Sequence, residues 1–213
     1  MKPRVGLIIQ ARLSSTRFPN KILADLLGKP VLEHVIERCH EAKLVDQVVI
    51  AAPHPLGICL NEELFIGSED DVLDRYYQCA TKYNFKIIVR ITADCPLTMP
   101  SEIDRCITRL LERDTHYVTN RPSIGDGFDV EVFTYQALKE AHERWSDEHV
   151  TTWMKTNTDY NPIHLEAEKL SLDTAQDLER IKDYVRRQAD TYNRGHWQLC
   201  SELPQTYSAI QQA

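Results

Sequence analysis

The sequence predicts an α/β fold in which a mostly parallel sheet is flanked by helices. Short apolar runs, typical of strands buried on both faces, alternate with stretches whose apolar residues recur every three or four positions. Repeated strand–helix units of this length indicate parallel strands with helical crossovers. The chain has 213 residues, of which 42% are hydrophobic and 27% charged, as in an ordinary globular protein. We expect one domain over residues 1–213.

The individual elements follow from these patterns. Strands are predicted at residues 5–9, 47–51, 64–66 and 86–91. Helices are predicted from Pro30 to residue 39, at 72–83, from a Ser101–Asp104 cap to residue 111, at 135–145 and at 174–188. Residues 125–133 are predicted to form a turn leading into a strand. The polar segment 191–213 is predicted to be a packed extension or a frayed tail.

Charge and cysteine content narrow the class of function. The net charge of −7 argues against a nucleic-acid-binding surface, yet residues 1–43 carry eight basic and four acidic side chains. This local surplus suits a small anionic ligand. The six cysteines form no C-x-x-C pair, so no zinc site is indicated. With no secretory signal and no run of about 18 apolar residues, we expect a cytoplasmic protein that does not insert into a membrane.

The segment that follows the first predicted strand is the main candidate for ligand binding. Residues 10–21 hold three cations and three hydroxyl groups just before a helix: Arg12, Ser14, Ser15, Thr16, Arg17 and Lys21. Ligands of open parallel sheets bind beyond the carboxyl ends of the strands, so this loop could cradle a triphosphate. It lacks the glycines and the Gly-Lys-Ser/Thr ending of a P-loop. By itself, the loop could equally be a solvated surface segment.

The loop is one of several motifs that resemble a known family. The matched segments are residues 11–21, 27–35, 67–76, 89–97, 126–133, 148–151 and 172–178. Their order and spacing closely resemble the sugar-acid cytidylyltransferases, which activate Kdo and sialic acids, and above all the branch of spore-coat polysaccharide biosynthesis proteins. The resemblance implies a Rossmann-like, GT-A-like nucleotidyltransferase fold. It also implies that an acceptor oxygen attacks the α-phosphorus of CTP and expels pyrophosphate.

The resemblance also implies roles for residues of the loop and of two later motifs. CTP would be bound by Ala11, Arg12, Ser15, Arg17 and Lys21. Arg12, Lys21 and Asp94 would be catalytic: the two cations would offset the charge on the transferring phosphoryl group, and Asp94 would act through the metal that it binds. Asp94 and Asp173 would hold Mg²⁺, which prefers carboxylate oxygens. Asp173 could instead be a helix N-cap, although Thr174 and Asp177 could form that cap, and Asp94 could be a turn residue.

A further group of residues in the matched motifs is assigned to the acceptor: Arg75, Arg90, Asp129, Glu131 and His149. His149 could equally be a structural histidine, and Glu131 could face solvent. The acceptor is expected to be anionic and small, such as a sugar acid. Cys95 stands after Asp94 where Kdo enzymes have a glutamate, which argues against Kdo itself.

Three functions remain open on sequence grounds. The first is cytidylyl transfer to a sugar acid for glycan or surface-polysaccharide synthesis. The second is transfer to a phosphorylated small alcohol or acid, giving a CDP-linked product. The third is a non-catalytic nucleotide-binding scaffold, which the joint presence of Asp94 and Asp173 disfavours. We also expect a homodimer, because residues 125–162 break the strand–helix rhythm and the resemblance implies that such a segment reaches across to a partner subunit. Residues 53–63 are shorter than in relatives and are expected to trim one edge of the sheet.

Overall fold

The strands that the sequence predicts form the centre of a sheet in the computed structural model. The structure describes residues 2–58, 60–120, 127–144, 150–157, 160–162 and 170–191. The predicted parallel strands are β1 (Val5–Gln10), β4 (Gln47–Ala52), β5 (Glu63–Ile66) and β6 (Ile87–Thr92). Three further strands follow: β7 (Tyr117–Thr119), β8 (Glu131–Thr134) and β9 (Tyr160–Pro162). In the described residues the order is β5-β4-β1-β6-β8-β7-β9, with β8 antiparallel to both neighbours. The predicted α/β class is confirmed.

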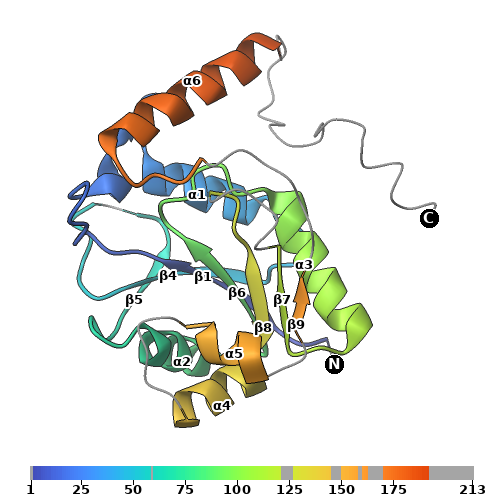
Figure 1. Cartoon of the computed structure of the whole chain (residues 1–213). Coiled ribbons are helices and arrows are strands. Elements are labelled where there is room, and N and C mark those ends of the chain that lie inside the picture. The colour runs from blue at the N-terminus through green and yellow to red at the C-terminus, as the bar shows by residue number, and fades with distance from the viewer. Residues whose placement is uncertain are drawn as a thin grey trace.

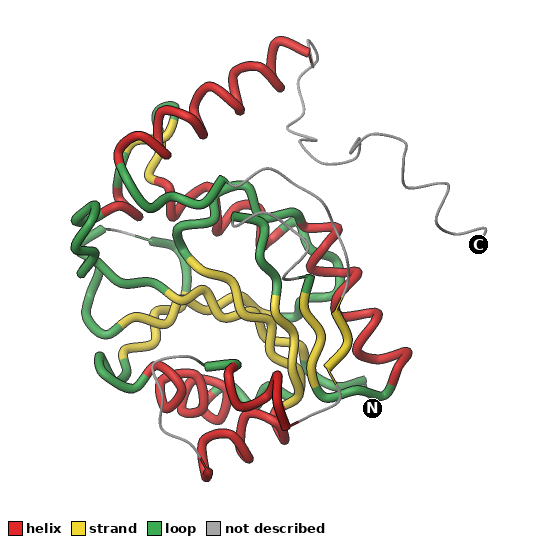
Figure 2. Tube along the Cα trace, in the orientation of Figure 1, coloured by secondary structure: helices red, strands yellow, loops and turns green. Residues whose placement is uncertain are grey.

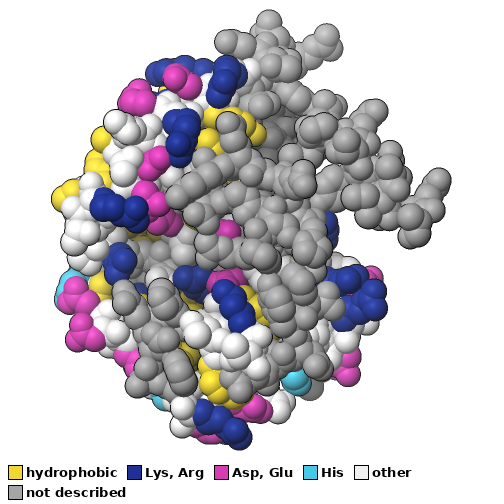
Figure 3. Space-filling model, viewed as in Figure 1, with side chains coloured by type: hydrophobic (Ala, Val, Ile, Leu, Met, Phe, Trp, Pro, Cys, Tyr) yellow, Lys and Arg dark blue, Asp and Glu magenta, His cyan; other side chains and the backbone are white. Residues whose placement is uncertain are grey.

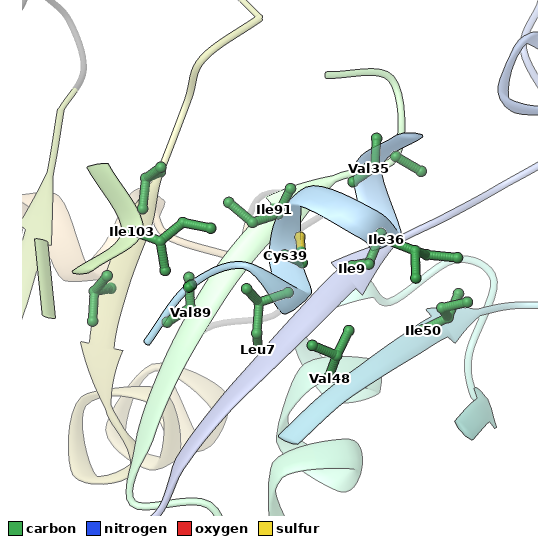
Figure 4. Close-up of a cluster of buried hydrophobic side chains, with 14 of the residues drawn as sticks. Leu7, Ile9, Val35, Ile36, Cys39, Val48, Ile50, Val89, Ile91 and Ile103 are labelled. Atoms are coloured by element: carbon green, nitrogen blue, oxygen red, sulfur yellow. The ribbon is translucent and has the colours of Figure 1, made fainter. Parts of the chain in front are cut away.

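Helices cover both faces of this sheet (Figures 1 and 2). On one face, α1 (Val31–His40) and α3 (Pro100–Arg113) pack on β1, β4 and β6. Figure 4 shows this layer, in which Val35 and Cys39 of α1 meet Leu7 and Ile9 of β1. On the other face lie α2 (Val72–Lys82), α4 (Tyr135–Arg144) and α5 (Thr152–Asn157). The two faces therefore hold two separate apolar cores.

A third, smaller core lies beyond the carboxyl ends of the strands, beneath α6 (Ala175–Thr191). Leu178, Ile181 and Val185 of α6 pack there, as their helical spacing predicts. Their partners come from the loops that follow β1 and β6 and from the segment before α6, and they include Phe18, Leu26, Leu97, Met99, Leu170 and Leu172. Leu26 belongs to a small hairpin of β2 (Asp25–Leu26) and β3 (Lys29–Pro30), which follows the 3-10 turn η1 (Lys21–Leu23). This core therefore ties together loops that are distant in sequence.

The order of the strands creates a crevice at the carboxyl ends of the central strands β1 and β6. From β1 the chain passes through α1 to β4 and β5 on one side, and then through α2 to β6 on the other side. The order in which strands are added to the sheet therefore reverses between β1 and β6. Such a switch point is where open α/β sheets bind ligands.

Two details differ from the sequence-based expectations. Ser101 does not cap α3, because the helix begins one residue earlier at Pro100, with Met99 as a cap residue that makes no side-chain hydrogen bond. Proline favours the first helical position, since its backbone nitrogen has no hydrogen to leave unsatisfied. Asp104 instead accepts hydrogen bonds from the backbone N–H groups of Lys43 and Leu44, at 3.0 and 2.9 Å. The short elements β2, β3, β7, α5 and β9 were not predicted.

The described helices include none that is both long and apolar enough to cross a bilayer. On the face shown in Figure 3, basic and acidic side chains are intermixed over the part of the surface that is described.

Candidate active site

A cavity of about 300 Å³ opens at the carboxyl ends of β1 and β6. Its lining comes from the ends of these two strands, the loop after each of them, and the segment that leads into α6. The lining residues are Gln10, Arg12, Ser14, Ser15, Thr16, Arg17, Lys21, Ile22, Thr92, Ala93, Asp94 and Asp173. The structure thus brings the predicted CTP loop and both predicted metal ligands to one place.

Lys21 lies at the centre of this cavity wall and connects its three segments. Its Nζ is 2.5 Å from Asp94 Oδ2 and 3.5 Å from Asp173 Oδ1, and it donates to the backbone oxygen of Leu172 at 2.8 Å. Arg17 Nη2 forms a second ion pair with Asp173, at 2.9 Å. The two carboxylates therefore share one cation although 78 residues of sequence separate them.

The backbone explains how these segments meet. Asn20 has a φ of 55°, in the left-handed region that asparagine tolerates, and turns the loop into η1 so that Lys21 begins the turn. The N–H of Leu172 donates to the backbone oxygen of Asp94 at 3.0 Å. Gly127 allows the chain to pass close by, since a Cβ there would lie 2.5 Å from the carbonyl carbon of Leu170. These contacts fix the positions of Asp94 and Asp173.

Asp173 does not cap helix α6, because Thr174 and Asp177 form the cap together. Asp177 Oδ2 accepts from the backbone N–H groups of Thr174 and Asp173, at 2.7 and 3.1 Å. The Thr174 hydroxyl donates to the same oxygen at 2.9 Å, and it accepts from the N–H of Asp177 at 3.3 Å. This reciprocal arrangement is a capping box, and it leaves the Asp173 side chain directed to the cavity.

The protonation of Asp94 reflects its surroundings. Burial opposes its charge, but the positive charge and the hydrogen bond of Lys21 more than offset this effect, with help from Thr92. The pKa of Asp94 is consequently below its ordinary value, so the side chain is an anion at neutral pH.

The other residues of the predicted CTP loop differ in exposure. Ala11 is buried, and its N–H donates to the backbone oxygen of Ala51 at 3.0 Å. Arg12 and Arg17 are exposed on the cavity wall. Ser15 accepts from the N–H of Phe18 at 3.4 Å and so shapes the turn as well as lining the cavity.

Of the residues assigned to the acceptor, the four that the structure describes lie in different surroundings. Arg75 is buried at 1% exposure and donates to the backbone oxygen of Ser68 at 2.6 Å. Its pKa is lowered by burial, and the nearby charge of Arg12 contributes to the shift. Asp129 is half-buried, and His149 lies outside the described residues. Whether these three residues contact an acceptor stays a prediction.

Arg90 and Glu131 form a buried ion pair on the neighbouring strands β6 and β8. Glu131 does not face solvent, since its side chain is 1% exposed. Its Oε1 accepts from Tyr117 Oη at 2.6 Å and Thr151 Oγ1 at 2.7 Å, and it lies 3.2 Å from Lys155 Nζ. Both carboxylate oxygens are thus occupied by protein groups.

Sequence reasoning missed the partners of this pair. Gln10 accepts two hydrogen bonds from Arg90, and Tyr117, Thr151 and Lys155 surround Glu131. Gln10 could have been found, because it is the first residue of the candidate loop and directly follows a predicted strand. The other three lie in the region after residue 116, where the strand–helix pattern gives no register.

The donor set around Lys21 fits a divalent cation. Asp94 and Asp173 already place carboxylate oxygens around a single positive group. Within the described ranges, no three His, Cys, Asp or Glu side chains gather as a complete metal cage. Mg²⁺ is commonly held by one or two carboxylates, with water and substrate phosphates completing its octahedron. The two aspartates therefore suit a metal that arrives with a triphosphate.

Comparison with known proteins relates this geometry to a family. A family described as cytidylyltransferase matches residues 7–212. The 3-deoxy-manno-octulosonate cytidylyltransferase of Geobacter sulfurreducens is 40% identical over 111 residues, which cover 49% of this chain and 44% of that enzyme. A spore coat polysaccharide biosynthesis protein of Bacillus subtilis is 28% identical over 204 residues, covering 82% and 83%. A cytidylyltransferase structure from Leptospira borgpetersenii superposes with a TM-score of 0.81 at 27% identity, covering 87% and 88%.

Proposed function

The chain belongs to the cytidylyltransferase family, and we propose that it transfers CMP from CTP to a small sugar acid with release of pyrophosphate. The family identifies a CTP-dependent nucleotidyltransferase and confirms the resemblance found in the sequence. The observation that carries the proposal is the single cavity at the switch point of the sheet, where the cationic loop meets Asp94 and Asp173.

The cationic loop is proposed to bind the triphosphate. Arg12, Arg17 and Lys21 line the cavity together with the hydroxyl group of Ser15, and Ala11 fixes the start of the loop on β4. Cations and hydroxyl donors in these positions would neutralise the non-bridging oxygens and the departing pyrophosphate. Preorganised charge of this kind supplies most of the catalysis in phosphoryl-group chemistry.

Asp94 and Asp173 are proposed to hold Mg²⁺. When bound, the metal would polarise the α-phosphate and offset the negative charge of the triphosphate. Lys21 separates the two carboxylates in the structure, so it keeps them from repelling each other before the ligands bind. Its ammonium group also lies where it can donate to phosphate oxygens that enter the cavity.

The acceptor is proposed to be a sugar acid used for glycan or surface-polysaccharide precursors. The support comes from the names of the relatives, one of which acts on 3-deoxy-manno-octulosonate and another of which belongs to spore coat polysaccharide synthesis.

A pyrophosphate-release assay tests this proposal. CTP, UTP, ATP and GTP are each supplied with Mg²⁺ and a panel of sugar acids, neutral sugars and phosphorylated small alcohols. We expect release with CTP and a sugar acid, and little with the other nucleotides. Release that depends on a phosphorylated alcohol would replace the proposed acceptor class, and equal turnover of UTP would contradict the preference for CTP.

We also propose that the protein is a homodimer with one domain in each subunit. The support is the departure of residues 125–162 from the strand–helix rhythm, which leaves α5 and β9 as additions to a nucleotide-binding core. Light scattering at micromolar concentration should give about twice the 24.6 kDa of one chain, and a monomer mass would contradict the dimer.

A further inference from the structure

The buried ion pair of Arg90 and Glu131 has no role in the mechanism proposed above, yet it adjoins the cavity. Isolated charges are costly to bury, and an ion pair in a protein interior is often no more stable than well-packed apolar side chains. Glu131 lies in the core between the sheet and α2, α4 and α5, beside apolar residues such as Tyr117 and Phe133. Such a pair in an otherwise apolar layer calls for a function other than stability.

Gln10 connects this ion pair to the cavity. Arg90 Nη2 and Nε donate to Gln10 Oε1 at 2.9 and 3.1 Å, and Gln10 is a lining residue of the cavity. A guanidinium group has only donors, so the amide must present its oxygen to Arg90. The orientation of the carboxamide is therefore fixed, and its Nε2 group remains as the donor for a ligand.

Arg90 is itself held by Glu131. The carboxylate pairs with Arg90 through one oxygen and accepts from Tyr117 and Thr151 through the other. Tyr117 lies on β7 and Thr151 directly precedes α5, so the carboxylate is attached to two further elements. A side chain with this many partners has a single orientation. The ion pair with this fixed carboxylate in turn fixes the orientation of the Arg90 guanidinium group.

The charges near Gln10 favour an anion. Arg90 contacts Gln10 directly, and its positive charge together with that of Lys155, which lies beside Glu131, exceeds the one negative charge of Glu131. Gln10 is the last residue of β1, whereas the cations proposed for the triphosphate all come from the loop after it. The amide thus lies at the sheet side of the cavity, apart from the phosphate-binding loop.

We infer that Gln10 is an acceptor-binding residue whose amide donates to the carboxylate of the sugar acid, and that Arg90 and Glu131 are positioning residues that orient it. The inference rests on the proposed function and deepens it by assigning the part of the cavity that recognises the acid group. It also changes the role expected for Glu131 from direct contact to action through Arg90.

Isothermal titration calorimetry tests this inference without turnover. The enzyme is first saturated with Mg²⁺ and α,β-methylene-CTP, in which a carbon atom replaces the oxygen between the α- and β-phosphorus atoms, so that pyrophosphate cannot leave. It is then titrated with 3-deoxy-manno-octulosonate, with N-acetylneuraminate or, as a neutral control, with mannose. Wild-type protein should bind at least one acid and should not bind mannose. If the nucleotide analogue fails to bind, the proposed function is wrong. If it binds but neither acid does, a carboxylate ligand is ruled out.

The decisive variant is Gln10→Glu, which keeps an oxygen for Arg90 and replaces the donor by an anionic oxygen. We expect the Kd for the acid to rise by about tenfold to a hundredfold, as for the loss of one hydrogen bond to a charged group. The Kd for α,β-methylene-CTP should change by less than about threefold. Acid binding that stays within about twofold of wild type would overturn the role of Gln10.

The positioning role is tested with Glu131→Gln and a matched control, Glu102→Gln. Glu102 is also a buried glutamate paired with an arginine, but it lies on α3 at the opposite face of the sheet. Glu131→Gln should weaken acid binding by about tenfold, while Glu102→Gln should leave it unchanged. Equal acid affinity in the two variants would show that Glu131 has only a structural role.

Discussion

Two ion-pair clusters adjoin the same cavity, and they differ in how they are assembled. Lys21, Asp94 and Asp173 come from three loops, and their side chains keep 12%, 27% and 21% of their exposure. Arg90 and Glu131 come from adjacent strands, and the glutamate is 1% exposed. The first cluster is open to a ligand, whereas the second is enclosed by tyrosine, threonine and lysine side chains.

This difference suggests different roles for the two clusters: the first takes part in the reaction, and the second holds neighbouring residues in place. A partly exposed ion pair that lines a cavity can exchange its carboxylates for phosphate oxygens at lower cost, because water and ligand can replace each partner. A buried carboxylate cannot change partners without leaving a charge uncompensated. We therefore expect substitutions in the first cluster to affect turnover, and substitutions in the second to affect stability and the placement of its neighbours.

The largest expected effect is on stability, from Glu131→Ala. This change leaves Arg90 and Lys155 beside an apolar core without their counter-charge, and should lower the free energy of unfolding by about 3–5 kcal/mol. Urea denaturation measures it. Glu102→Ala is the control and should lose less, because its partner Arg105 is 32% exposed. A decrease of less than about 1 kcal/mol in the free energy of unfolding of Glu131→Ala would contradict the view that the buried cluster, unlike the open one, is essential for stability.

The next effect is on turnover, from Asp94→Asn and Asp173→Asn. Each should lower kcat by about a hundredfold or more, which corresponds to about 3 kcal/mol of transition-state stabilisation. Unfolding free energies should change by no more than about 1 kcal/mol, because the ion pairs are partly exposed. Near-normal kcat in Asp173→Asn, with unchanged dependence on Mg²⁺, would remove Asp173 from the site.

The buried cluster should also make stability depend on pH. Burial alone would raise the pKa of Glu131, but Arg90, Lys155, Tyr117 and Thr151 together lower it to about 2. The unfolded chain binds this proton near pH 4.3, so the stabilisation is complete above that value and is lost as the pH falls toward 2. Between pH 5 and pH 3 wild type should lose about 2 kcal/mol more than Glu131→Gln, as measured by urea unfolding. Parallel pH profiles would contradict this assignment.

The smallest effect is expected from Asp177→Ala, which removes one of the two side chains that form the capping box of α6. The loss of capping should cost about 1 kcal/mol in the free energy of unfolding. The result should be the opposite of that for Asp173→Asn, with a clear loss of thermal stability and a modest change in kcat. A hundredfold loss of kcat in Asp177→Ala would mean that the cap, rather than the Asp173 side chain, controls the site.

The sequence predicted the parallel half of the fold well, because its strands are continuous apolar runs and its helices have clear apolar faces. The strands β1, β4, β5 and β6 lie within a few residues of their predicted bounds. The half after residue 116 was less predictable, since β7 and β9 have only three residues each. Their positions depend on the pairing of β7 with β8 and of β9 with β7, which no local pattern reveals.

The site was predictable to the extent that its residues lie in loops directly after strands. The loop that holds Arg12 and Lys21 was singled out in this way, the role of Asp94 was implied by the family resemblance, and Thr174 with Asp177 forms the cap that the sequence suggested. The chain from Glu131 through Arg90 to Gln10 could not be found, because it depends on strand register. Arg90 pairs with Glu131 only because β8 returns antiparallel beside β6.

We propose that the enzyme transfers CMP from CTP to a sugar acid at the site formed by Lys21, Asp94 and Asp173. Mass spectrometry of the reaction of CTP, Mg²⁺ and a sugar acid tests it most directly, with wild-type protein and Asp94→Asn in parallel. The account predicts a CMP–sugar acid product and pyrophosphate in equal amounts with wild type, and on the order of a hundredfold less product with the variant. A CDP-linked product, or equal product from Asp94→Asn, would contradict it.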